Sequence, residues 1–170
     1  MGLDLSLRAT GMAVVPTSWA LDWSCVDVYH CGYELETTAT VAEQLERLSH
    51  ISIEVLAFAE EHNVTHVFVE EYAFSRVAAR AFSIGELGGV VKLDMMRRGL
   101  IPSVVNATAA RSVLGKFSGK GQKNQCRAVL TSMGCPRSWT EDEVDAFVAA
   151  NWGLSELGGA GILVERDPSA

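Results

Sequence analysis

Three acidic residues of this sequence lie in segments that otherwise have the pattern of buried β-strands. Asp4 stands between Leu3 and Leu5, and alternation along a strand places Asp4 on the opposite face from both leucines. Glu70 and Glu71 end a short segment that is otherwise apolar. A charge within a covered sheet is costly, so these acids are candidates for a functional site. The residues alone leave open which of Glu70 and Glu71 faces it.

Two further acids, Asp142 and Asp145, lie three residues apart in a predicted helix and therefore share one face. The run 141–143 is also explained by the helix dipole, which favours carboxylates in the first helical turn. Asp145 is less easily explained in this way, because apolar residues surround it at positions 144 and 146–148. Asp145 is therefore the stronger candidate of the two.

Carboxylates from the first strand, the fourth strand and a late helix can converge at one end of a sheet. Such a cluster of like charges needs divalent cations, and ligation by oxygen alone favours magnesium or manganese. No His or Cys accompanies these acids in the sequence, which argues against zinc. Two ions about 3.5–4 Å apart can clamp the attacking and leaving oxygens of a phosphodiester. The predicted chemistry is therefore metal-assisted phosphodiester hydrolysis.

The basic residues are gathered in one part of an acidic chain. The whole sequence has a formal charge of −7, yet residues 76–137 contain eleven basic and two acidic residues, a net charge of +9. The other residues carry 3 basic and 19 acidic side chains, a net charge of −16. Segregation of this kind is typical of proteins that bind a polyanion, because each phosphate contact releases counterions. The candidate phosphate contacts in this segment are Arg76, Arg80, Arg111, Lys116 and Lys120.

The elements that must position these residues follow from periodicity and capping signals. We predict five strands, at Met1–Ser6, Met12–Val15, Ser24–Tyr33, His66–Glu71 and Pro102–Asn106. We predict helices over residues 41–62, Ala78–Arg98, Thr108–Gly115, Gln122–Met133 and Thr140–Trp152. Two of these helices open with a capping box, Thr40 with Glu43 and Thr140 with Glu143.

This order of elements predicts an α/β fold with a mixed five-stranded sheet. The first three strands form an antiparallel meander, and the last two, which alternate with helices, join it in parallel. Helices then cover both faces. We expect one domain over residues 1–152, followed by a Gly-rich and polar tail over 153–170 with no assigned role.

Composition excludes several other classes of protein. With 170 residues and 48% hydrophobic side chains, the chain can bury a core without disulfides or metals. The four cysteines form no Cys-x-x-Cys pair, so we expect them to be reduced. The longest segment without Asp, Glu, Lys or Arg has 13 residues, too few to span a membrane. With no secretory signal visible, we expect a cytoplasmic protein of a bacterial or phage-infected cell.

Five segments, in this order, resemble motifs of the RuvC-type Holliday junction resolvases, which belong to the RNase H-like superfamily. They are Gly2–Gly11, Val69–Phe74, Glu86–Val91, Lys123–Gln125 and Asp142–Ala146. Each is short, but together they span roughly residues 2–150. The sequence departs from the family in its opening motif, where Leu5 and Ser6 replace the usual Pro and Gly.

The resemblance implies a set of site residues. Asp4, Glu70, Asp142 and Asp145 would bind two Mg²⁺ ions, which Mn²⁺ could replace, and the alignment favours Glu70 over Glu71. Lys123 would lie near the scissile phosphate.

The resemblance also implies how the DNA and a second copy of the chain are bound. One aromatic residue, Tyr72 or Phe74, would wedge into the junction. The helix Ala78–Arg98 would form a homodimer, which suits the two-fold symmetry of a four-way junction. The apolar face expected to form that dimer carries Phe82, Gly85, Gly89, Leu93 and Met96.

The function expected from the sequence is therefore a structure-selective endonuclease that resolves four-way DNA junctions by paired nicks from a homodimer. Two alternatives stay open: a nuclease of the same fold that cuts flaps and forks, and a non-catalytic junction-binding protein. An actin-like or sugar-kinase domain shares the early hairpin, but such proteins duplicate the domain and are much longer than 170 residues.

Overall fold

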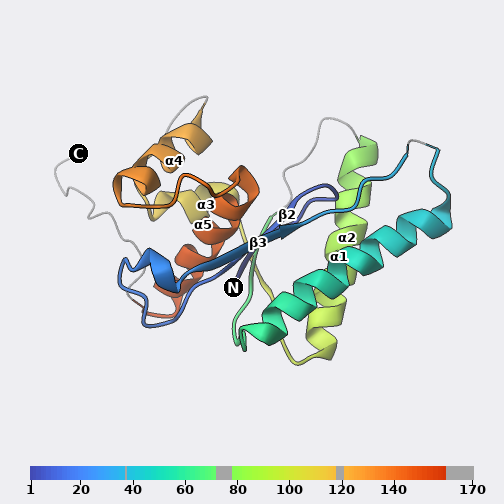
Figure 1. Ribbon diagram of the computed structural model, residues 1–170, viewed down its shortest axis with the longest axis horizontal. Helices are drawn as coiled ribbons and strands as arrows, with labels where there is room; N and C mark the ends of the chain where they lie inside the picture. The colour runs from blue at the N-terminus through green and yellow to red at the C-terminus, as the bar shows by residue number, and fades with distance from the viewer. Residues whose placement is uncertain (37, 72–77, 118–120, 160–170) are drawn as a thin grey trace.

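A computed structural model describes residues 1–36, 38–71, 78–117 and 121–159, with the side chains of 78–80 excepted. Five strands form one sheet, seen nearly edge-on at the centre of Figure 1. Their bounds are β1 Gly2–Asp4, β2 Thr10–Val14, β3 Asp27–Cys31, β4 Phe68–Glu70 and β5 Ser103–Val105.

The sheet has the order β3-β2-β1-β4-β5. β1 pairs antiparallel with β2, and β2 pairs antiparallel with β3, which forms the predicted meander. β4 runs parallel to β1, and β5 runs parallel to β4. The predicted mixed five-stranded sheet is therefore confirmed.

Helices cover both faces of this sheet (Figure 1). The long helices lie on one face, and their bounds are α1 Val41–Glu61 and α2 Ala78–Arg97. Three shorter helices lie on the other face: α3 Ala107–Ser112, α4 Gln122–Ser132 and α5 Glu141–Glu156. Leu3 and Met12 of the sheet are completely buried with α1 and α2, whereas Phe147 is buried on the α5 side. Both predicted capping boxes are present, at the start of α1 and of α5.

α5 lies against the centre of the sheet at backbone distance, because glycines face it. A Cβ atom at Gly2 would stand 1.9 Å from the carbonyl oxygen of Ala146, and one at Gly11 would stand 2.1 Å from that of Asp142. A side chain at either position would push the helix off the strands. The two glycines therefore fix how closely α5 approaches β1 and β2.

The structure differs from the prediction at the start of β3 and at the end of α5. Residues Trp23–Cys25 form a short 3₁₀ helix, so the third strand starts at Asp27 instead of Ser24. The cause is Asp22, whose carboxylate accepts hydrogen bonds from the backbone and hydroxyl of Ser24.

α5 continues four residues past its predicted end at Trp152, to Glu156, so the expected domain boundary at residue 152 falls inside a helix. Gly153 was placed in the Gly-rich tail, but it is a packing residue inside α5. A Cβ there would stand 2.1 Å from the ring of Phe68. Among the described residues, no helix is long and apolar enough to cross a membrane.

Candidate active site

Two of the predicted acids lie side by side at one edge of the sheet. β1 and β4 run parallel with Leu3 opposite Val69, so the next residues, Asp4 and Glu70, leave the sheet at the same level. Asp4 also pairs with Gly11 of β2, the residue that touches the backbone of Asp142. Leu3 and Leu5 point into the core beneath α1 and α2, which leaves Asp4 facing α5, as the alternation predicts.

α5 brings the other two acids to the same place. Asp145 is buried, with 3% of its surface exposed, and Asp142, one turn earlier, is half-buried. Because Gly11 lets the first turn of α5 approach the sheet so closely, the helix acids lie over the strand acids. The structure thus brings together all four acids that the sequence analysis assigned to metal binding.

The four carboxylates perturb one another strongly. Burial, and then the charges of Glu70 and Asp145, raise the pKa of Asp4 to about 8. Burial and the charge of Asp145 likewise raise the pKa of Glu70 to about 7. The pKa of Asp142 is also raised, by burial and by Asp145 and Glu141. Carboxyl groups with such pKa values are typical of sites that bind a cation or act on protons.

Two cationic side chains lie inside the cluster. The guanidinium of Arg111 donates a hydrogen bond to Asp145 Oδ1 at 3.0 Å and lies 3.6 Å from Glu70 Oε1. The ammonium of Lys123 contacts the other oxygen, Asp145 Oδ2. Burial opposes the charge of Lys123, but Asp145 outweighs it, so the pKa of Lys123 lies above its ordinary value. Both oxygens of Asp145 are therefore held by cations.

Glu71 points away from this cluster. Its side chain is exposed, and Glu71 Oε2 accepts a hydrogen bond from the amide of Asn106 at 3.1 Å. Asn106 in turn caps α3 by accepting a hydrogen bond from the backbone N–H of Thr108. Glu70, in contrast, has a side chain that is only 12% exposed and lies beside Arg111. Of the two neighbouring glutamates, Glu70 is the one inside the cluster.

The other predicted DNA-binding residues fall into three groups. Arg111, a predicted phosphate contact, has a side chain that is 9% exposed and buried between Glu70 and Asp145. Lys116 is exposed, as a phosphate contact must be. Those whose side chains lie outside the described residues are Tyr72, Phe74, Arg76, Arg80 and Lys120.

Sequence reasoning missed two interactions of the site: the ion pairs of buried Arg111 with Glu70 and Asp145, and the contact of Glu143 with His30. The burial of Arg111 did have a signal in the sequence. The neighbours of Arg111, at positions 109, 110, 113 and 114, are apolar, which is the same signal that drew attention to Asp145. Glu143 ties α5 to β3, because its carboxylate lies 2.9 Å from Nδ1 of His30 while it also completes the capping box with Thr140. No sequence spacing connects residues 30 and 143, so the second interaction had no signal.

Comparison with known proteins identifies the family. The family model of the crossover junction endodeoxyribonuclease RuvC matches residues 1–148. This chain belongs to the RuvC family. The RuvC crossover junction endodeoxyribonuclease of Xanthobacter autotrophicus is 29% identical over 154 residues, which cover 88% of this chain and 85% of that protein.

Solved RuvC structures share the fold. The structure of Thermus thermophilus RuvC in complex with a Holliday junction substrate matches with a TM-score of 0.72 at 18% identity, over 96% of this chain and 97% of that one. Another structure of Thermus thermophilus RuvC matches with a TM-score of 0.62 at 20% identity, over 95% and 98% of the two chains. RuvC proteins are nucleases that depend on divalent metal ions, and this chain is accordingly an enzyme of the endonuclease class.

The raised pKa of Asp4 predicts how stability depends on pH in metal-free buffer. The unfolded chain ionises Asp4 near its ordinary pKa of 3.8, whereas the folded protein keeps it protonated up to about pH 8. The folded state therefore binds more protons over this interval, so its free energy of unfolding falls as pH rises from about 4 to 8. Asp4→Asn removes this loss, and we expect the variant to melt above the wild type at pH 8.

Thermal denaturation in EDTA from pH 4 to 9 measures this effect. The melting temperatures of Asp4→Asn and of the wild type should converge at the acid end of the range. Glu71→Gln, which changes an exposed carboxylate on the same segment, is the matched control and should melt like the wild type throughout. If Asp4→Asn melts below the wild type at pH 8, Asp4 is not under the repulsion described here.

Proposed function

We propose that this chain resolves four-way DNA junctions by hydrolysing phosphodiester bonds at the carboxylate cluster, with divalent cations bound there. The observation that carries the proposal is the convergence of Asp4, Glu70, Asp142 and Asp145 in a chain of the RuvC family. A protein that only bound junctions would gain nothing from carboxylates beside phosphate, since they repel it.

The side chains of the cluster fit divalent cations. The ligand set is all oxygen, which suits Mg²⁺ with Mn²⁺ as a substitute. Glu70 Oε2 is buried and has no hydrogen-bond partner among the described residues, so one ligand oxygen is available. The carboxyl groups of Asp4 and Glu70, whose pKa values are raised by their neighbours, would regain their charge beside a cation.

We infer that Asp4, Glu70, Asp142 and Asp145 hold two Mg²⁺ ions. No group of three or more acidic, His or Cys side chains among the described residues is arranged to hold a metal ion, and Lys123 and Arg111 contact the two oxygens of Asp145. Cation binding at this position therefore requires Lys123 to give up Asp145. When bound, two such ions polarise the phosphodiester and activate the attacking water.

The two cations of the site, Lys123 and Arg111, have different proposed roles. Lys123 is about half exposed, so its ammonium can turn from Asp145 towards a phosphate in front of the cluster. There it would stabilise the negative charge that develops during hydrolysis. Arg111 is buried and stays behind Glu70 and Asp145, where it limits the repulsion between these carboxylates.

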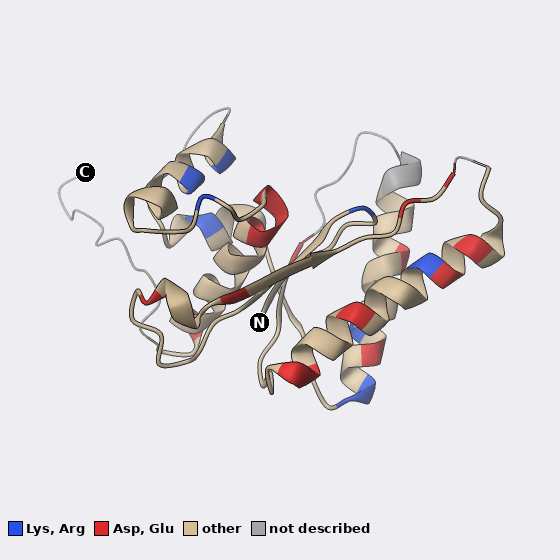
Figure 2. Cartoon of the chain, in the orientation of Figure 1, with Lys and Arg blue, Asp and Glu red and all other residues tan. Residues whose placement is uncertain are grey.

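The surface charge guides DNA towards this edge of the sheet. In Figure 2 basic residues mark α3, α4 and the loops beside them, and further basic residues lie on the other face, on α1 and towards the end of α2. The surface of α1 itself is mostly acidic. Lys116 is the described exposed member of the predicted contacts, and Arg76, Arg80 and Lys120 stay proposed contacts. Tyr72 and Phe74 stay the two candidates for the one aromatic wedge.

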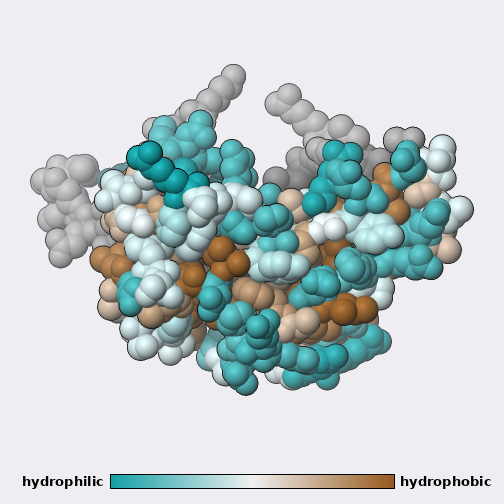
Figure 3. Space-filling model, viewed as in Figure 1, coloured by the Kyte–Doolittle hydropathy of each residue, from teal (hydrophilic) through white to brown (hydrophobic). Residues whose placement is uncertain are grey.

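The exposed face of α2 supports the proposed homodimer. Phe82, Leu93 and Met96 are 74%, 43% and 57% exposed, so this face of α2 presents large apolar side chains to the surface. Gly85 and Gly89 on the same face have no atom within 4 Å of an added Cβ, so another helix can approach closely there. Figure 3 shows hydrophobic side chains interrupting the hydrophilic surface on the side of α1 and α2. Two matched sites in a symmetric dimer could cut both strands of a two-fold junction.

Removing single carboxylates tests the metal site. We expect Asp4→Asn, Glu70→Gln and Asp145→Asn each to lower single-turnover cleavage of a labelled four-way junction in Mg²⁺ by about 100-fold or more, because each loses a ligand. Junction binding in EDTA should be unchanged or tighter, since one repulsive charge is gone. Glu71→Gln is the control and should cleave like the wild type.

Full activity in any of the three variants removes that residue from the site. Fork, flap and linear duplex DNA assayed in parallel measure substrate choice. Resolution of the four-way junction with little cutting of the others is the outcome that we expect.

Two lysines should behave differently. Lys116→Ala should weaken binding to all branched DNA and reduce the log–log salt slope by roughly one unit, as for a lost phosphate contact. Lys123→Ala should lower the single-turnover cleavage rate more than the affinity, because its charge acts in the transition state. Equal losses of rate and affinity in Lys123→Ala would reduce Lys123 to an ordinary phosphate contact.

A charge on the exposed face of α2 should separate the dimer. Phe82→Glu places a carboxylate in the proposed interface, so light scattering at micromolar protein should change from a dimer to a monomer. Ile53→Glu is the matched control, since Ile53 is 60% exposed on α1, and it should stay dimeric. A wild-type protein that is monomeric in both low and moderate salt would exclude the proposed dimer.

A further inference from the structure

A cavity of about 210 Å³ opens directly beside the carboxylate cluster. It shares Lys123 and Asp145 with the cluster, so whatever fills it lies next to the scissile phosphate proposed above. Its volume is below the roughly 300–1,000 Å³ of pockets for drug-sized ligands, which suits a single flat ring system. The side chains around it come from α4, from the loop that precedes α5, and from the first turns of α5: Lys123, Asn124, Arg127, Trp139, Glu141 and Asp145.

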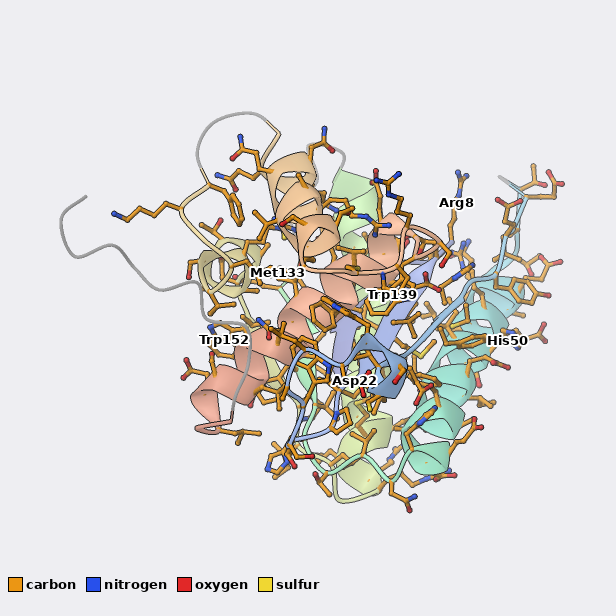
Figure 4. All side chains as sticks on the ribbon, turned by 60° about the vertical axis from the view of Figure 1, so that its left-hand side comes forward. Arg8, Asp22, His50, Met133, Trp139 and Trp152 are labelled. Atoms are coloured by element: carbon orange, nitrogen blue, oxygen red, sulfur yellow. The ribbon has the colours of Figure 1, made fainter. Side chains whose placement is uncertain are left out.

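The aromatic wall of this cavity is held rigidly. The ring of Trp139 packs against Trp23 and Phe147, with centroids 5.7 Å away in each case. The guanidinium of Arg127 donates hydrogen bonds to the carbonyls of Pro136, Arg137 and Trp139, at 3.3, 3.1 and 3.0 Å, which fixes the loop that carries the ring. Figure 4 shows Trp139 beside the ribbon of α5. A fixed indole needs little reordering to stack on a ligand.

The polar groups of the cavity suit the edge of a nucleobase. Asn124 is exposed at its mouth and carries both a donor and an acceptor, a pattern that proteins use against adenine. Glu141, also exposed, offers acceptors only and so favours a base with an exocyclic amino group. Both residues lie on the rim, whereas Val144 is an apolar part of the lining.

We propose that this cavity binds one unpaired nucleobase of the DNA, adjacent to the scissile phosphate, by stacking on Trp139 and by hydrogen bonds to Asn124 and Glu141. The proposal rests on the proposed function only for the identity of the neighbouring phosphate. A base that carries an exocyclic amino group, which means adenine, cytosine or guanine, is preferred over thymine. The pocket would thereby position the strand for cleavage through a base and not only through the backbone.

Removing a base from the DNA tests the pocket without cleavage. The experiment measures binding of the wild type in EDTA to a set of four-way junctions. Each junction carries one abasic nucleotide, at a different position within two nucleotides of the cut. Stacking of one base on an aromatic side chain contributes about 1–3 kcal/mol, so we expect one abasic position to weaken binding by about 5- to 100-fold. At that position adenine, cytosine or guanine should bind more tightly than thymine.

Protein variants show whether the lost base lay in this cavity. Asn124→Ala, an exposed change, should reduce the preference for an amino-bearing base, and Trp139→Leu should make the protein insensitive to the abasic position. Arg137→Ala is the matched control, because Arg137 is exposed in the same loop but does not line the cavity. The abasic nucleotide should weaken binding of this variant as much as it weakens binding of the wild type. If Trp139→Leu does not fold, Asn124→Ala still decides the base preference.

Two outcomes would overturn the pocket: no abasic position that affects wild-type binding, or variants that lose as much affinity as the wild type on the abasic junction. Failure of the pocket and failure of the proposed function are distinguishable. A wild type that cleaves junctions in Mg²⁺ but ignores abasic sites loses only the pocket. A wild type that senses the abasic site but does not cleave loses only the proposed function.

Discussion

The contact between the backbone of α5 and the first two strands is the constraint on which the site depends. Gly2 and Gly11 allow it, because any Cβ at these positions would stand within about 2 Å of a helix carbonyl oxygen. At an ordinary spacing of about 10 Å between a helix and a sheet, side chains would separate Asp142 from Asp4. The aromatic contacts of Trp139 with Trp23 and Phe147, and the bond between His30 and Glu143, hold the start of α5 against the sheet.

Because the helix and the strands lie so close, electrostatic repulsion between the carboxylates opposes the assembly of the site. Four carboxylates share a partly buried edge with two cations, and protonation and ion pairing relieve the repulsion between them. A buried ion pair is weak evidence for stability, since desolvation offsets much of its attraction. Arg111 and Lys123 are therefore better explained by function than by stability. The buried cation, Arg111, lies between Glu70 and Asp145, and the exposed one, Lys123, lies where its ammonium can turn towards solvent.

Most of the fold follows from local signals in the sequence, and its misread positions have physical causes. The mixed sheet follows from the order of strands and helices, and both capping boxes follow from short spacings. Gly153 was placed in the tail because a glycine that ends a helix and one that receives the ring of Phe68 look alike in sequence. Asp4 and Asp145 were found because each is out of place locally, whereas Asp142 also suits a first helical turn and the choice of Glu70 over Glu71 came from the family resemblance. Arg111 was predicted as a phosphate contact from the basic segment in which it lies, and only the fold places it beside Glu70.

The two faces of the sheet serve separate purposes, which explains why the chain can be acidic and still handle DNA. The face with α1 and α2 carries a mostly apolar core, in which the hydroxyl of Ser52 donates a hydrogen bond to Asp94, and its surface is acidic along α1. This face also exposes the apolar side of α2. The opposite face gathers the carboxylates, their cations, the basic surface and the cavity beside Trp139. Because acidic helices repel phosphate, DNA that approaches this molecule is directed to the face where the carboxylates lie. Negative charge on α1 therefore contributes to orientation together with positive charge on α4.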